Sequence, residues 1–160
     1  MKKINVDDLP WDVWASPKGK FRSKFKQLSI ALGAVPDAPV GAGGHPFDLS
    51  IETLGPGETS CPYHEHLSQW ELFYILSGSG TIRADGIRHE VRAGDAILHP
   101  PGDAHQITNT GGEDLKYLIV ADNPALDVCR FPDSGKMSIS GSKFRSVFRA
   151  NEVDYFDGEE

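Results

Sequence analysis

The chain contains the segment Gly57-Glu58-Thr59-Ser60-Cys61-Pro62-Tyr63-His64-Glu65-His66-Leu67-Ser68-Gln69-Trp70-Glu71-Leu72-Phe73-Tyr74-Ile75-Leu76-Ser77-Gly78. His64 and His66 are two residues apart, and in a β-strand such side chains share one face. The residues between His66 and Glu71 are enough to reverse the chain. We therefore predict that Glu71 returns on a neighbouring strand and faces the two imidazoles.

A second segment adds another histidine after a tight turn. It reads Gly94-Asp95-Ala96-Ile97-Leu98-His99-Pro100-Pro101-Gly102-Asp103-Ala104-His105-Gln106-Ile107-Thr108-Asn109. His105 follows the turn and should close the site from a separate hairpin. Three imidazoles and one carboxylate suit one divalent transition metal. Iron, manganese, nickel, cobalt and zinc all accept these ligands, so the sequence leaves the metal open.

Short strand-like segments surround the histidines, and turn residues separate them. The candidate strands cover 47–54, 60–66, 71–76, 80–85, 87–91, 96–99, 105–109 and 115–121. This regular spacing predicts an all-β sandwich or barrel. The 17 glycines and 11 prolines fit a turn-rich β-protein. A chain of 160 residues fits one domain, with its barrel core at about 45–121.

The two ends of the chain read differently from this core. Residues 1–44 form a predicted N-terminal arm, and residues 122–160 an extended C-terminal tail with possible strands at 127–131 and 144–149. Within the arm, 18–26 places a cation at every second position, which is the period of a strand. It is interpreted as a solvated edge strand or as a basic lip for an acidic ligand. Residues 27–32 are expected to continue as strand.

Composition argues against several classes of partner. The formal net charge is −7, whereas nucleic acids and anionic membranes require a basic surface. Two cysteines, Cys61 and Cys129, do not make a disulfide framework, which favours a reducing compartment. The first residues lack the apolar stretch of a signal peptide, and no apolar run has membrane-spanning length. We therefore predict a cytoplasmic protein whose partner is a small molecule.

The two histidine segments resemble the two motifs of the cupin superfamily. The first motif, G-x5-HxH-x3–4-E-x6-G, is matched by His64, His66, Glu71 and Gly78, with Gly57 one residue further out. The second, G-x5-PxG-x2-H-x3-N, is matched without a gap by Gly94, Pro100, Gly102, His105 and Asn109.

This resemblance implies a double-stranded β-helix, which is a jelly-roll barrel of six to eight strands. It also implies one divalent metal held by His64, His66, Glu71 and His105, and frequently a homodimer that exchanges N-terminal strands. The segments 127–133 and 154–159 look like the C-terminal segments of small bacterial cupins labelled sugar-phosphate isomerases.

Three functions remain open at this stage. The first is a metal-dependent enzyme on a small carbonyl or hydroxy substrate, such as a sugar or sugar-phosphate isomerase. His99 is its candidate catalytic proton carrier, with packing beside the site as the alternative role. The second is a non-haem iron dioxygenase, because two histidines and a carboxylate bind iron and dioxygen. The third is a non-catalytic sugar- or ligand-binding module. A homodimer is expected in each case, because the arm carries aromatic residues that need a surface to cover them.

Overall fold

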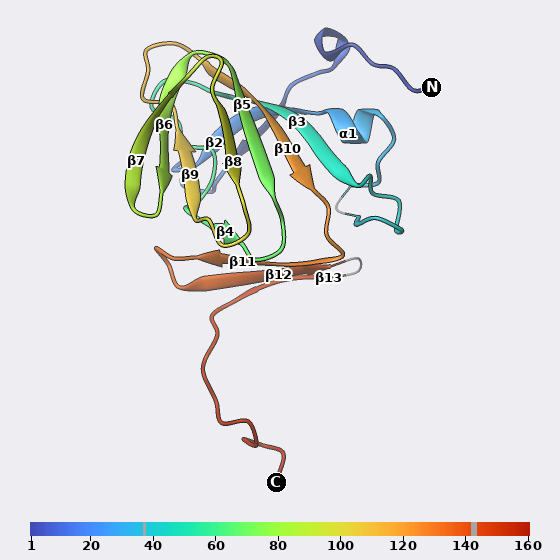
Figure 1. The fold of residues 1–160 in the computed structure, drawn as a ribbon, viewed down its shortest axis with the longest axis vertical. Helices are drawn as coiled ribbons and strands as arrows, with labels where there is room; N and C mark the ends of the chain where they lie inside the picture. The colour runs from blue at the N-terminus through green and yellow to red at the C-terminus, as the bar shows by residue number, and fades with distance from the viewer. Residues whose placement is uncertain (37, 142–143) are drawn as a thin grey trace.

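The computed structural model describes residues 1–36, 38–141 and 144–160. Strands dominate it, with one short 3-10 helix and one short α-helix near the N-terminus (Figure 1). The elements in chain order are η1 (Val6–Asp8), β1 (Asp12–Ala15), β2 (Arg22–Gln27), α1 (Leu28–Ala31), β3 (Phe47–Leu54), β4 (Glu65–His66), β5 (Glu71–Ser77), β6 (Ser79–Ala84), β7 (Ile87–Arg92), β8 (Ala96–His99), β9 (His105–Thr108), β10 (Leu115–Asp122), β11 (Leu126–Phe131), β12 (Lys136–Gly141) and β13 (Phe144–Phe148).

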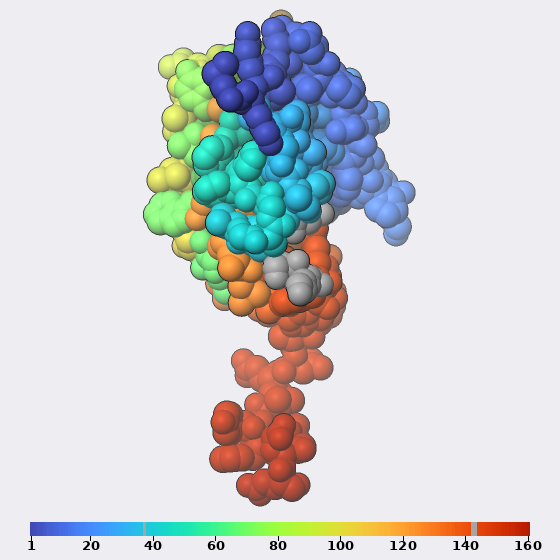
Figure 2. Space-filling view, turned by 90° about the vertical axis from the view of Figure 1, so that its right-hand side faces the viewer, coloured from blue at the N-terminus to red at the C-terminus, as the bar shows by residue number. Residues whose placement is uncertain are grey.

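These strands form three sheets. The orders are β1-β2-β3-β10-β5-β8, β7-β6-β9 and β13-β12-β11-β4. The first two make the walls of the barrel, and the third lies across its lower end in Figure 1. The C-terminal end of the chain then projects away from the body (Figure 2). Within the described residues, no helix has the length and apolar character needed to cross a membrane.

The core lies between the two walls and follows the alternation of the strands. On β5, Phe73 and Ile75 are buried, whereas Tyr74 and Leu76 are exposed. The buried cluster contains Leu54, Phe73, Ile75, Ile82, Val91, Ile107, Leu115 and Tyr117. Burying a large apolar side chain contributes about 1.5–3 kcal/mol, so this cluster accounts for much of the barrel's stability. The predicted all-β double-stranded β-helix is confirmed.

The structure differs from the sequence expectation in the predicted strand at 27–32. Its place is taken by the single helical turn α1. Leu28 and Ser29 are buried there, and the Ser29 hydroxyl accepts a hydrogen bond from the Leu49 N–H at 2.7 Å. This contact with β3 overrides the strand preference of a short segment.

The predicted strand at 60–66 is also shorter than expected. Pro62 has no N–H to donate to a ladder, and His64 pairs with His105 only as an isolated bridge. The regular strand β4 therefore contains only Glu65 and His66.

The C-terminal region is more ordered than an extended tail. The strands expected near 127–131 and 144–149 are present as β11 and β13, but β12 was missed. A tight turn reverses the chain after β11, so that β12 pairs with it. In this turn the N–H groups of Ser134 and Gly135 both donate to the Phe131 carbonyl. Gly135 has a φ of 63°, a conformation that suits glycine in such a turn.

The predicted solvated edge strand at 18–26 is wrong in two respects. Its strand, β2, lies between β1 and β3 rather than at the edge. Lys26 is also buried: its Nζ donates to the Val6 carbonyl at 2.7 Å and lies 4.7 Å from the centre of the Trp11 ring. The hydrogen bond to the carbonyl and the cation–π contact with the ring replace the water that the ammonium group loses on burial.

Candidate metal centre

The structure brings the four predicted metal ligands together. The ring centroid of His64 lies 5.0 Å from that of His66 and 4.7 Å from that of His105. An oxygen of Glu71 lies 2.9 Å from His105 Nε2 and 3.7 Å from His66 Nε2. Candidate ligand atoms of His64, Glu71 and His105 all lie within 4.8 Å of one another. An ion about 2.0–2.2 Å from each donor fits separations of this size.

Each of the three imidazoles is oriented through its Nδ1 atom. That atom lies 2.9 Å from the Pro62 carbonyl oxygen in His64, 2.6 Å from Asp127 Oδ2 in His66, and 3.0 Å from the Asp103 carbonyl oxygen in His105. A proton on Nδ1 satisfies each of these acceptors and leaves the lone pair on Nε2. This arrangement is typical of metal-binding histidines.

The carboxyl group of Glu71 is held in its charged form. Burial raises its pKa, but the hydrogen bond from His105 and the attraction of His66, His105 and His64 outweigh burial and lower the pKa to about 2. The Glu71 carboxylate therefore faces His105 Nε2 and His66 Nε2 as an anion.

Backbone hydrogen bonds tie the two histidine segments together. His64 and His105 exchange both of their backbone bonds, at 3.1 Å and 2.7 Å. The Gly102 N–H also donates to the His66 carbonyl at 2.7 Å, and its φ of 87° suits a residue without a Cβ. The glycine turn thus aligns the strand of His66 with that of His105.

Asn109 fixes the loop that follows β9. It is fully buried, and its amide donates at 2.8 Å to the carbonyls of Leu54 and Glu113. Its side-chain oxygen accepts from the Gly111 N–H at 2.9 Å. The last residue of the second motif therefore anchors this loop to β3.

His99 points into the barrel from β8, on the same face as Glu71, with which it is paired. It is 2% exposed, and its ring stacks on His105 with centroids 3.9 Å apart. Its Nδ1 lies 2.7 Å from Asp103 Oδ2, whereas its Nε2 is buried without a hydrogen-bond partner. Burial and the neighbouring His105 lower its pKa. It is therefore a neutral imidazole with a free nitrogen near the cluster.

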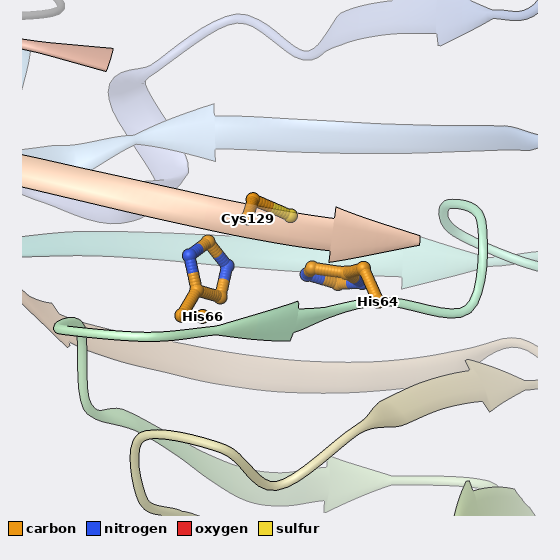
Figure 3. Close-up of side chains that lie close together, drawn as sticks. All are labelled: His64, His66 and Cys129. Atoms are coloured by element: carbon orange, nitrogen blue, oxygen red, sulfur yellow. The ribbon is translucent and has the colours of Figure 1, made fainter. Parts of the chain in front are cut away.

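Three side chains near the site were not identified from the sequence. They are Asp127, Cys129 and Phe131, on alternate positions of β11. Asp127 holds His66, and Phe131 stacks with His64 at a centroid distance of 6.3 Å. Cys129 lies beside both histidines (Figure 3). Their period-two spacing is visible in the sequence, but the pairing of β11 with β4 is not.

An open hollow of about 480 Å³ lies beside His66. Gln69 lines it on the barrel side, and Asp127, Ser140 and Arg145 line it from β11, β12 and β13. The C-terminal sheet therefore forms one wall of the approach to the cluster.

A barrel of this topology with these four convergent side chains defines the cupin class. Residues 50–121 match the family model described as "Cupin domain", so this part of the chain is a cupin domain.

Two curated relatives are similar in sequence. Auxin-binding protein 1 of Arabidopsis thaliana is 28% identical over 138 residues, which cover 81% of this chain and 63% of that protein. The oxalate-binding protein of Thermotoga maritima is 39% identical over 67 residues, or 42% of this chain and 54% of that protein. The chain thus spans less than two thirds of the length of these relatives.

A solved structure from Silicibacter pomeroyi, described as a sugar phosphate isomerase from a cupin superfamily, aligns with a TM-score of 0.75. The alignment covers 92% of this chain and 92% of that chain, with 19% sequence identity. At that identity the likeness establishes the fold.

Proposed function

We propose that this protein is a metal-dependent enzyme acting on a small carbonyl or hydroxy substrate, most specifically a sugar or sugar-phosphate isomerase. The observation that carries the proposal is the orientation of three imidazoles through their Nδ1 atoms toward one carboxylate. His64, His66, Glu71 and His105 would hold one divalent transition metal. Such a metal, when bound, supplies a Lewis acid that polarises a substrate carbonyl.

The side chains around the cluster support a role for proton transfer. Isomerisation moves a proton between adjacent carbons, and a neutral imidazole is a suitable carrier. In this proposal His99 accepts the proton at Nε2, while Asp103 holds the proton on Nδ1. This is how a carboxylate orients a catalytic histidine in other enzymes.

The hollow beside His66 supports a small polar substrate. Arg145 lines its outer wall, and a guanidinium binds a phosphate or carboxylate through paired hydrogen bonds. Gln69 and Ser140 offer hydrogen bonds to hydroxyl groups. The likeness of 127–133 and 154–159 to proteins labelled sugar-phosphate isomerases agrees with this substrate class.

The test is to follow a panel of aldose and ketose phosphates by NMR with metal-loaded protein. We expect turnover that disappears in Glu71→Gln, because a ligand is lost. His99→Gln should lower kcat by about 10²–10⁴-fold while the metal stays bound. Arg145→Gln should mainly raise KM, by about tenfold, for the loss of one charged hydrogen bond. A metal-loaded protein that leaves the whole panel unchanged contradicts the proposal.

A second candidate is a non-catalytic ligand-binding protein, because two relatives are named for binding auxin and oxalate. Both of those ligands carry carboxylates. Calorimetry with oxalate distinguishes the candidates: metal-dependent binding without any turnover supports the binding function. Oxygen consumption by the Fe(II) form would instead indicate a dioxygenase.

A further inference from the structure

The strand β11 presents three side chains to the metal centre. Asp127 and Phe131 each contact one of its histidines, and Cys129 lies between them in the sequence. Cys129 is the direct partner of His66 in the antiparallel pairing of β11 with β4. Directly opposed residues of an antiparallel pair project from the same face of the sheet. The thiol therefore lies on the same side as the His66 imidazole (Figure 3).

The distances place the sulfur within reach of a shared ion. Cys129 Sγ and a ring nitrogen from each of His64 and His66 all lie within 4.8 Å of one another. A metal about 2.0–2.1 Å from nitrogen and about 2.3 Å from sulfur can join donors up to roughly 4.4 Å apart. Small rotations of these side chains are sufficient to bring all three to one ion.

The thiol makes weak polar contacts, with the Ser138 hydroxyl and with the backbone beside it. It is 8% exposed, and its sulfur lies 3.9 Å from the Arg130 carbonyl oxygen, a long contact. Cys61, by contrast, lies 3.6 Å from His64 Nδ1, which is the ring nitrogen turned toward the Pro62 carbonyl. Cys61 therefore lies beside the nitrogen that orients the His64 ring.

We propose that Cys129 is a further ligand of the metal held by His64 and His66, and that it gives the site a preference for thiophilic ions. The inference rests on the proposed metal centre. On binding, the thiol releases its proton to solvent and its sulfur forms a bond to the metal, with no change in oxidation state. Thiolate sulfur favours zinc and cobalt over manganese and magnesium, which prefer oxygen.

The test uses the full chain loaded with cobalt(II). Sulfur ligation produces a near-ultraviolet charge-transfer band, separate from the visible bands that report nitrogen and oxygen ligands. We expect the charge-transfer band in the unaltered protein and in Cys61→Ser, and its loss in Cys129→Ser with the visible bands retained. The ratio of zinc to manganese affinity should fall about tenfold or more in Cys129→Ser alone.

X-ray absorption on the unaltered zinc protein avoids dependence on any variant. A zinc–sulfur distance of about 2.3 Å supports the inference, and a first shell of nitrogen and oxygen alone overturns it. Cobalt that binds without the charge-transfer band, and whose binding is lost in Glu71→Gln, would support the metal centre and overturn the role of Cys129. If the substrate panel is inert but the band is present, only the proposed catalysis fails.

Discussion

His66 Nδ1 lies 2.6 Å from Asp127 Oδ2, although 61 residues separate them in the chain. The other oxygen of Asp127 accepts from the Ser68 N–H at 2.9 Å. Burial raises the pKa of Asp127, but the bonds from His66 and from the backbone at Ser68 and Gln69 outweigh burial and lower it. Asp127 is thus a fixed anion that orients His66.

Replacing Asp127 with Asn should weaken metal binding by about 10–100-fold, since an uncharged amide orients and polarises the imidazole less well. The barrel should remain folded, because Asn can still accept from His66. Calorimetric titration with zinc measures the affinity. Asp133→Asn is the matched control: Asp133 pairs with Arg83 at the surface, 2.7 Å away, and its loss should not change metal affinity. Equal effects in both variants would refute the role of Asp127.

The two thiols of the metal-free protein should be unreactive near neutral pH. Burial raises the pKa of Cys61 and that of Cys129, each to about 12. Because only the thiolate reacts, alkylation by iodoacetamide at pH 8 should be about a thousandfold slower than for a free cysteine. The rate should rise about tenfold per pH unit up to the raised pKa. Mass spectrometry follows the labelling, and urea-unfolded protein is the control. Fast labelling of the folded chain would contradict this prediction.

Asn109→Ala should destabilise the fold by about 2–4 kcal/mol. The substitution removes three hydrogen bonds and leaves the buried carbonyl of Leu54 and the part-buried carbonyl of Glu113 without these donors. Urea denaturation measures the free energy of unfolding. Asn151→Ala, at an exposed position, should leave that free energy within about 0.5 kcal/mol of the original. A similarly small change for Asn109→Ala would contradict the prediction, because it would mean that these carbonyl groups find other hydrogen-bond donors.

A homodimer remains a prediction, and we expect it at the β1 edge of the six-stranded sheet. The edge strand β1 exposes Val13 and Trp14, at 59% and 43%. Exposed apolar side chains on an open edge favour pairing with another chain. Sedimentation should show a dimer at micromolar concentration, and Trp14→Ser should weaken it. A monomer in the unaltered protein would contradict the expectation.

Much of the barrel could be predicted because it depends on local patterns. The predicted strands between 71 and 121 correspond to β5 through β10, since alternation and turn residues are encoded within each segment. The helical turn α1 could not be predicted, because a contact between Ser29 and Leu49 decides it. The strand β12 was missed because its alternation covers only Met137 to Ser140, which is too short to distinguish a strand from a serine-rich loop.

The candidate site divides in the same way. His64, His66, Glu71 and His105 could be grouped because each lies on a strand or turn with a recognisable spacing. Asp127 and Cys129 could not be placed with them, because the pairing of β11 with β4 depends on where the C-terminal sheet docks. The inward direction of His99 likewise required the register of β8 against β5.

The docking of β11 has a consequence for any shortened form of this protein. The segment matched by the family model ends at residue 121, before the carboxylate, the thiol and the aromatic ring that surround His64 and His66. A fragment cut at that boundary would keep all four predicted ligands and would still match the family model. It would nevertheless lack the Asp127 carboxylate that orients His66. The side chains that contact His64 and His66 from β11 therefore lie outside the segment that the family model matches.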